Sequence, residues 1–206
     1  MKKFHKLGVI GRFKPLHNGG ALLLETVCEQ AEHVIIGIGS PNKYNMRNPF
    51  TAEETKEILE AYLSPRFKNY EIVFVQDYAH IPEYSDGKKW KEETVKRFGS
   101  LDAFVTGNDW TAELLKQDYK ILHPAELIPE EKWIMLRATM VRVEMAKGGN
   151  WQELVPEAVA RYIKENKLDE RFRKEFGLQT IAKLADCKDY TQPEDAWAER
   201  LHTLER

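Results

Sequence analysis

The sequence predicts an α/β fold: a Rossmann-like, doubly wound parallel sheet with helices at its C-terminal end. Short apolar runs alternate along the chain with segments that carry apolar residues at helical spacing. The apolar runs are largely continuous, which is typical of strands covered on both faces. Polar residues follow several of these runs, at the sheet edge where ligands bind in open α/β folds. Right-handed crossovers between the strands are expected by default.

The expected strands are apolar runs bounded by glycine, proline or polar residues. They cover residues 7–10, 33–39, 70–76, 102–105 and 119–122. The expected helices cover residues 21–31, 51–63, 88–98, 111–117, 139–147 and 154–167. The charged remainder, 168–206, is also expected to be helical, with Trp197 and Leu201 on one stripe.

Signals at the helix ends support these bounds. Thr51 can accept a hydrogen bond from the Glu54 amide while the Glu54 carboxylate reaches back to the Thr51 amide, which is a capping box. Pro65 ends that helix, because proline disfavours helical backbone at the residue before it. Gly148 and Gly149 form the expected stop of the helix at 139–147.

Composition limits the classes of protein that this chain can belong to. Its 206 residues, 42% of them apolar, suffice for one ordinary domain, expected over 1–153, with a helical extension over 154–206 packed on it. A net charge of -2 argues against a dedicated nucleic-acid binder. The apolar runs are too short for a membrane span or a signal peptide, and Cys28 and Cys187 are the only cysteines of the sequence. We therefore expect a cytoplasmic protein without a membrane partner.

Residues 6–31 form the stretch around which the chain is organised. They predict a buried strand, a tight turn at Gly11 to Pro15, and a helix whose first turn faces the end of that strand. A helix N-terminus presents unpaired backbone N–H groups and a partial positive charge. Arg12, Lys14 and His17 fall at the same place, so a phosphate group is the expected ligand.

The residues of this turn, 11–20, resemble the G-R-F-x-P-x-H-x-G-H signature of the nucleotidyltransferase superfamily that includes nicotinamide mononucleotide (NMN) adenylyltransferases. Every fixed position fits except the last, where Gly20 stands in place of the second histidine. In that family the second histidine is a main electrophilic contact to the transferred phosphate. The resemblance therefore implies the family's fold and a lower rate.

The resemblance to archaeal-type NMN adenylyltransferases continues in the same order to about residue 174. Residues 36–40 and 47–51 resemble the family's second strand and following loop, and 75–77 resemble the strand end that helps bind NMN. Trp90 is similar to a tryptophan that stacks on the nicotinamide ring. Residues 106–108 match the end of the fourth strand, and 137–142 resemble the phosphate-binding S-x-T-x-x-R element, with Arg137 in place of serine.

The resemblance implies attack by the NMN phosphate on the α-phosphorus of ATP, which gives NAD and pyrophosphate. Such a reaction needs alignment and charge balance, with Mg²⁺ bound to ATP and no metal held by protein side chains. The implied catalytic residues are His17, Arg12, Lys14 and Arg142. The implied ATP and phosphate contacts are Gly11, Arg12, Phe13, His17, Gly19, Gly20, Gly107, Asn108, Arg137, Thr139 and Arg142. The implied contacts to the acceptor nucleotide are Ser40, Arg47, Asp77 and Trp90.

Two other functions stay open at the level of sequence. A sibling enzyme could use phosphopantetheine, FMN or another phosphorylated acceptor, or CTP in place of ATP. A nucleotide-binding sensor or pseudoenzyme is the alternative that Gly20 supports. Gly20 also fits a substitution made to trap substrates, or an active variant in which Arg137 or Lys14 compensates, and the guanidinium fork of Arg137 favours compensation. A homo-oligomer is expected in either case.

Each candidate residue also has a purely structural interpretation. Trp90 could be a packing anchor, Asp77 could cap the following turn, and Asn108 could occupy a left-handed turn. Thr139 could be an ordinary helix cap, and Arg142 could pair with an acid on the helix surface. His17 could be a capping histidine, and Cys28 has no catalytic context, so a buried thiol is expected there.

Overall fold

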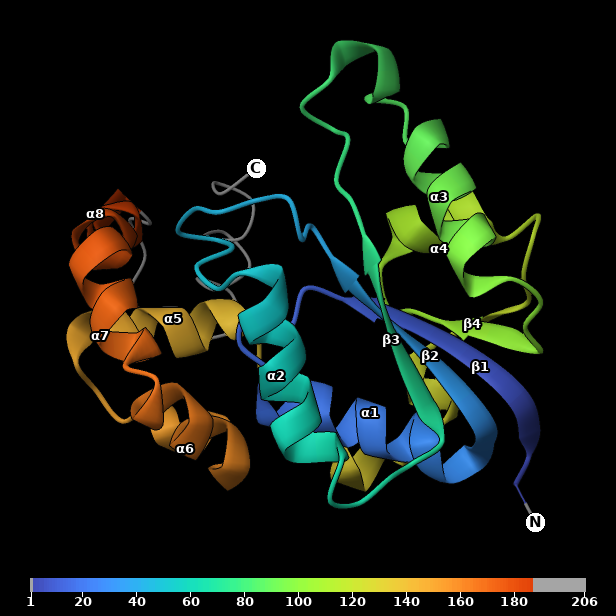
Figure 1. Ribbon diagram of the computed structural model, residues 1–206, viewed down its shortest axis with the longest axis horizontal. Helices are drawn as coiled ribbons and strands as arrows, with labels where there is room; N and C mark the ends of the chain where they lie inside the picture. The colour runs from blue at the N-terminus through green and yellow to red at the C-terminus, as the bar shows by residue number, and fades with distance from the viewer. Residues whose placement is uncertain (1, 187–206) are drawn as a thin grey trace. The chain divides into compact units, whose positions relative to one another are not determined.

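The computed structural model describes residues 2–186 (Figure 1). Two compact units can be distinguished by their packing, and each is described by itself. The sheet unit contains the residues up to Arg12, Leu22–Lys43 and Leu63–Trp133. The helical unit contains Phe13–Ala21, Tyr44–Tyr62 and the residues from Ile134 on. The expected boundary at residue 153 stays a prediction.

The sheet unit holds a parallel sheet whose described strands have the order β3-β2-β1-β4-β5. The strands are β1 (Phe4–Gly11), β2 (Ala31–Gly39), β3 (Tyr70–Val75), β4 (Ala103–Val105) and β5 (Ile121–Leu122). From β1 the chain adds β2 and β3 on one side, and then returns to add β4 and β5 on the other. The predicted Rossmann-like, doubly wound parallel sheet is therefore confirmed.

The strand register brings the carboxyl ends of the first three strands to one edge. Gly11 lies beside Ile38 of β2, and Gly39 lies beside Val75 of β3. Val105 of β4 pairs with Val9, two residues before the end of β1. The polar residues that follow these strands are therefore placed at the sheet edge expected to bind ligands.

Helices α3 (Lys88–Phe98) and α4 (Asp109–Leu115) cover one face of the sheet (Figure 1). Phe98 and Phe104 are fully buried with ring centroids 5.1 Å apart, and Tyr119 stacks on Phe104 at 5.8 Å. A Cβ added at Gly8 or Gly37 would lie 2.8 Å from the Phe98 ring. These two glycines therefore allow α3 to approach the strands closely.

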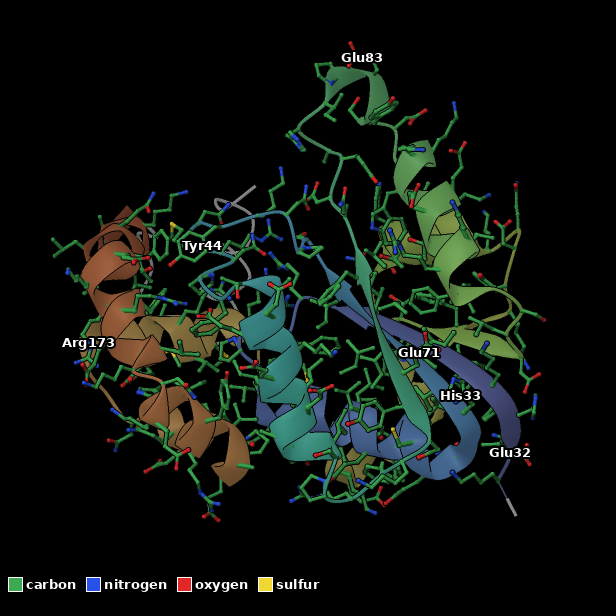
Figure 2. All side chains as sticks on the ribbon, in the orientation of Figure 1. Glu32, His33, Tyr44, Glu71, Glu83 and Arg173 are labelled. Atoms are coloured by element: carbon green, nitrogen blue, oxygen red, sulfur yellow. The ribbon has the colours of Figure 1, made fainter. Side chains whose placement is uncertain are left out.

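Helix α1 (Asn18–Gln30) begins in the helical unit and continues in the sheet unit. Its residues Leu24, Val27 and Cys28 are fully buried. Burial raises the pKa of the Cys28 thiol to about 12, so the thiol stays protonated, and the expected buried cysteine is confirmed. On the adjacent strands β2 and β3 of the sheet, the exposed side chains of His33 and Glu71 lie 3.8 Å apart, measured from Nε2 to Oε2 (Figure 2).

The helical unit is built from α2 (Ala52–Leu63) up to Tyr62 and from the helices that follow Ile134. These are α5 (Ala138–Lys147), α6 (Glu157–Glu165), α7 (Leu168–Phe172) and α8 (Leu178–Asp186), with a π-helical segment at Arg173–Gly177. Trp151 and Phe172 are among its largest buried side chains. Residues 187–206, with the expected stripe of Trp197 and Leu201, lie outside the described residues.

Ion pairs and ring contacts fasten α2 and the loop before it to the later helices of this unit. Glu54 accepts two hydrogen bonds of 2.6 Å from the Arg171 guanidinium, which also donates to the Pro49 carbonyl at 3.2 Å. Tyr44 donates to Glu175, and its ring meets that of Phe176 edge-on at 5.4 Å (Figure 2). The helices are therefore held by directional contacts as well as by apolar packing.

The helix-end signals are confirmed. Glu54 N–H donates to Thr51 Oγ1 at 3.1 Å and Thr51 N–H donates to a Glu54 carboxylate oxygen at 2.9 Å, so the capping box is present. Helix α5 ends at Gly148, whose φ of 72° lies in the left-handed region. Among the helices of residues 2–186, none combines the length and apolarity needed to cross a membrane.

We expect Phe104→Ala to lower the free energy of unfolding by about 3–5 kcal/mol, because it removes a fully buried ring between two aromatic neighbours. The exposed Tyr84 is the control, and its change to alanine should cost less than about 1 kcal/mol. Urea unfolding followed by circular dichroism measures both. Equal losses in the two variants would contradict this assignment of the core.

Candidate functional site

In the sheet unit, the first predicted residues lie at the ends of β1 and β2 or directly after them. Gly11 is the last residue of β1, with Arg12 directly after it. A Cβ added at Gly39 would lie 3.6 Å from the Gly11 carbonyl oxygen and 3.8 Å from Arg12 Cγ. Ser40 follows with a φ of 53°, a left-handed conformation that is uncommon for a residue with a side chain. Backbone strain of this kind clusters at functional sites.

A hydrogen-bonded cluster joins the ends of β2 and β3. Ser40 Oγ donates to Asp77 Oδ2 at 3.2 Å. Asn42 Nδ2 donates to the Asp77 carbonyl, and the Asp77 amide donates back to Asn42 Oδ1, both at 2.9 Å. Asp77 also accepts from the Ala79 amide at 2.9 Å, so the expected turn cap is confirmed. Sequence reasoning missed Asn42, because nothing in the pattern distinguishes it from other polar loop residues.

The residues after β4 carry out structural roles of their own. Asn108 Oδ1 accepts from the Thr111 amide at 2.9 Å and caps α4, while the Asn108 amide donates to Thr106 Oγ1 at 3.1 Å. The left-handed turn considered for Asn108 is wrong, because its φ is -103°. A Cβ added at Gly107 would lie 3.4 Å from His123 Nε2. A hydrogen-bonding role toward a nucleotide stays a prediction for Asn108.

Trp90 is the packing anchor that its structural interpretation describes. It packs against the core cluster beneath α3, and its ring centroid lies 5.3 Å from that of Trp110. Trp110 is half exposed, and sequence reasoning missed it. An aromatic residue at the start of α4 was the available signal. Stacking of Trp90 on a nicotinamide ring stays a prediction.

In the helical unit, His17 caps the first turn of α1. The Gly20 amide donates to His17 Nδ1 at 3.1 Å, and the His17 carbonyl accepts from the Ala21 amide at 2.8 Å. Because a backbone amide can only donate, Nδ1 is an acceptor, and the neutral ring carries its proton on Nε2. His17 is therefore held as an N–H donor through Nε2. Phe13, earlier in the same turn, has a φ of 52°.

The two glycines of the motif are under different constraints. A Cβ added at Gly19 would lie 2.8 Å from the Ile134 carbonyl oxygen, a backbone atom that cannot move aside easily. A Cβ at Gly20 would lie 3.3 Å from Leu16 Cδ1, the end of a flexible side chain, and 3.7 Å from His17 Nε2. Glycine is therefore required by packing at position 19 but not at position 20.

The start of α5 is joined to the turn that carries His17. Arg142 is 2% exposed, and its guanidinium donates to the Lys14 carbonyl and to Thr139 Oγ1, each at 3.1 Å. Arg142 therefore does not lie on the helix surface, where its structural interpretation placed it. Thr139 is not the cap of α5 either, because the cap position is Arg137, which is exposed and has extended backbone. Arg47 is half-buried in the loop before α2.

Burial and the charges of this cluster together determine the protonation state of its histidine. Burial of the ring, with the Arg142 and Arg137 charges, lowers the pKa of His17 to about 4. His17 is therefore neutral near pH 7. Burial also lowers the pKa of Lys14 to about 8, partly opposed by Glu54, so most of this ammonium is charged at pH 7. The Lys14 side chain is fully buried, and its contact to a phosphate stays a prediction.

The predicted site residues thus form two sets, one in each unit. The sheet unit carries Gly11, Arg12, Ser40, Asp77, Trp90, Gly107 and Asn108. The helical unit carries Phe13, Lys14, His17, Gly19, Gly20, Arg47, Arg137, Thr139 and Arg142. In the helical unit the structure brings His17, Lys14, Thr139 and Arg142 together by hydrogen bonds or charge. This second set is suited to binding an anion, because it combines helix amides with cationic side chains.

We expect Gly19→Ala to lower the free energy of unfolding by about 1–3 kcal/mol, because the added methyl group meets the Ile134 carbonyl. Gly20→Ala is the matched control, and its effect should stay within about 1 kcal/mol, since alanine favours the helix and meets only a flexible side chain. Urea titrations compare the two. A loss at position 20 as large as that at position 19 would be inconsistent with this packing.

We expect the His17 ring to be neutral at pH 6, with its single ring proton on Nε2. Its pKa of about 4 lies below the unfolded value of 6.5, so the folded state binds fewer protons, and this residue's contribution to stability falls as pH drops from 6.5 toward 4. Nitrogen-15 NMR of the histidine rings reads the tautomer, with His17→Gln for assignment. A proton on Nδ1, or a pKa near 6.5, would refute this geometry.

Comparison with known proteins identifies the family of this chain. A model of the cytidylyltransferase-like family matches residues 9–144. The nicotinamide-nucleotide adenylyltransferase of Thermococcus sibiricus is 35% identical over 170 residues, which is 80% of this chain and 86% of that protein. The enzyme of the same name from Pyrococcus furiosus is 34% identical over 171 residues, 80% of this chain and 85% of that protein.

A solved structure supports the fold independently. It is a bifunctional NMN adenylyltransferase/ADP ribose pyrophosphatase from Francisella tularensis, complexed with AMP and a manganese ion, with a TM-score of 0.64 and 19% identity. The likeness covers 92% of this chain and 58% of that longer one, and at this identity it shows the fold alone. The family itself is shown by the sequence relatives and by the family model: this chain belongs to the nicotinamide-nucleotide adenylyltransferases of the cytidylyltransferase-like family.

Proposed function

We propose that this chain transfers the adenylyl group of ATP to NMN, giving NAD and pyrophosphate. Membership of the nicotinamide-nucleotide adenylyltransferases supports the reaction. The observation that carries the proposal is the His17 ring, which the Gly20 amide holds as an Nε2–H donor at the first turn of α1. A neutral donor beside helix amides is suited to a phosphate oxygen, because it binds the anion without taking a proton from it.

In the proposed reaction an oxygen of the NMN phosphate attacks the α-phosphorus of ATP. The bond between that phosphorus and the oxygen that bridges to the β-phosphorus breaks, and pyrophosphate leaves with the bonding electrons. No proton has to be removed from the attacking oxygen, because the phosphate is already ionised at neutral pH. The protein is needed to align the two anions and to stabilise negative charge on the phosphoryl oxygens, so hydrogen-bond donors are required and a general base is not.

The residues of the helical unit are assigned to the triphosphate in this proposal. His17 Nε2 donates to an oxygen of the α-phosphate, and the amides of the first turn of α1 contact the same group. Arg142 positions the turn through the Lys14 carbonyl and adds positive charge near it. Asp77 and Trp90, in the sheet unit, are assigned to the acceptor nucleotide together with Ser40 and Arg47.

Mg²⁺ is proposed to enter with ATP. Within residues 2–186, no group of three or more His, Cys, Asp or Glu side chains is placed to hold a metal ion. In this proposal the ion is held mainly by phosphate oxygens and water, which suits the octahedral preference of Mg²⁺. When bound, it neutralises charge on the triphosphate. A cytoplasmic location and a homo-oligomeric state complete the proposal.

We expect this chain to form NAD and pyrophosphate from ATP, NMN and Mg²⁺, and to form less product when CTP replaces ATP. His17→Ala should lower kcat by about 10²–10³, because it removes a preorganised donor to the phosphoryl oxygens. His5→Ala, at an exposed histidine of the sheet unit, should leave kcat unchanged. A coupled assay for NAD and an assay for pyrophosphate provide the measurements.

The outcomes separate the candidate functions. Pyrophosphate release with FMN or phosphopantetheine, and none with NMN, would favour a sibling enzyme. Binding of ATP without turnover on any acceptor would favour a nucleotide sensor, a function for which Gly20 is the only support in the sequence. Either outcome would refute the proposed reaction.

A further inference from the structure

The first turn of α1, in the helical unit, holds a neutral histidine where the proposed reaction needs positive charge. Negative charge on the phosphoryl oxygens has to be balanced while the group is transferred, and a cation does this better than a neutral donor. His17 cannot be that cation near pH 7, because its Nδ1 accepts from the Gly20 amide and its pKa is lowered to about 4. A positive charge that the protein itself contributes beside Mg²⁺ therefore has to come from another residue near the first turn of α1.

Two of the candidate cations are buried. Arg142 is 2% exposed, and two of its nitrogens donate to the Lys14 carbonyl and to Thr139 Oγ1. Lys14 is fully buried, and the Glu54 carboxylate lies close enough to raise its pKa in part. Both side chains are thus buried, and the Arg142 guanidinium joins the turn to the start of α5.

Arg137 differs from these two in its position. It is exposed, and it occupies the cap position of α5 with extended backbone. The segment leading to it passes directly against the first turn of α1, since the Ile134 carbonyl would lie 2.8 Å from a Cβ at Gly19. The Arg137 charge is among the causes of the lowered pKa of His17, so it acts on the same imidazole.

Gly20 adds a second observation. A Cβ at this position would lie 3.7 Å from His17 Nε2, so a longer side chain there would project beside the donor that faces the phosphate. Because Gly20 has no side chain, the group beside His17 has to come from another element. The guanidinium of Arg137 is always protonated, and it can donate two parallel hydrogen bonds to a phosphate.

We propose that Arg137 is a catalytic residue of this chain, which contacts the transferred phosphoryl group beside neutral His17 and supplies the positive charge that no side chain at position 20 provides. This inference rests on the proposed function. It also implies that positions 20 and 137 share one role, which is to contact the phosphoryl group and supply positive charge. A histidine at position 20 or an arginine at position 137 could fill that role.

The test is a set of variants of the full chain, assayed for kcat in NAD formation and for the Kd of ATP by calorimetry. Arg137→Ser should lower kcat by about 10²–10³ while the Kd of ATP changes less than about threefold. Arg137→Lys should retain part of the rate, because the charge remains but the fork is lost. Arg161→Ser, at an exposed arginine of α6, is the matched control and should leave both quantities unchanged.

The exchange variant tests the shared role. Gly20→His in the Arg137→Ser background should raise kcat at least about tenfold, and more than Gly20→His does in the parent chain, because the two changes act on one function. Gly20→Ala in the Arg137→Ser background should give no recovery. Thermal unfolding of each variant shows whether the fold is kept, which is expected since Arg137 is exposed.

The results that would overturn the inference differ from those that would refute the proposed function. If the parent chain forms NAD and Arg137→Ser keeps kcat within tenfold, or loses only affinity for ATP, Arg137 is not catalytic and the proposed function stands. A loss that Gly20→His fails to reverse would refute the shared role. If the parent chain forms no NAD, the proposed function fails, and the inference fails with it.

Discussion

The buried guanidinium of Arg142 is the interaction on which the anion-binding set of the helical unit depends. It donates to the carbonyl of Lys14 in the turn and to Thr139 on its own helix, so it fixes the start of α5 against the residues that lead to His17. A buried charge of this kind is costly unless its donors are satisfied, and here backbone and hydroxyl oxygens satisfy them. The arginine therefore acts first as a structural link. In the proposed function, its effect on phosphate binding comes partly through the geometry that it imposes.

That link has an electrostatic consequence. Burial of the imidazole, together with the permanent cation beside it, makes protonation of the ring unfavourable, and the Gly20 amide then determines which nitrogen accepts. The ring is thereby fixed in one protonation state and one tautomer. A donor that stays neutral near pH 7 does not exchange protons with the phosphate that it binds. The neutral state that lets His17 donate a hydrogen bond without exchanging protons thus also prevents it from supplying a positive charge.

Much of the fold could be predicted because local signals agreed with one another. The continuous apolar run of β2, the capping box at Thr51 and the Gly148 stop all correspond to observed features. Thr139 and Arg142 were predicted to belong to the site, but the hydrogen bond from Arg142 to the Lys14 carbonyl reaches a turn more than a hundred residues away, which spacing cannot show. The pairing of Asn42 with Asp77 was not predictable for the same reason. Long-range contacts between polar groups leave no periodic pattern in a sequence.

The two adjacent glycines of the motif show why sequence likeness and chemical function can separate at one residue. At position 19 a backbone carbonyl fixes the choice of glycine, so a change there disturbs packing before any chemistry is affected. At position 20 the neighbouring atoms belong to side chains, so the fold accepts glycine or a larger residue, and only the chemistry distinguishes them. A departure from the motif at position 20 is therefore compatible with an intact fold. Whether catalysis survives it depends on where the surrounding elements place positive charge, and α5 places an arginine at its start.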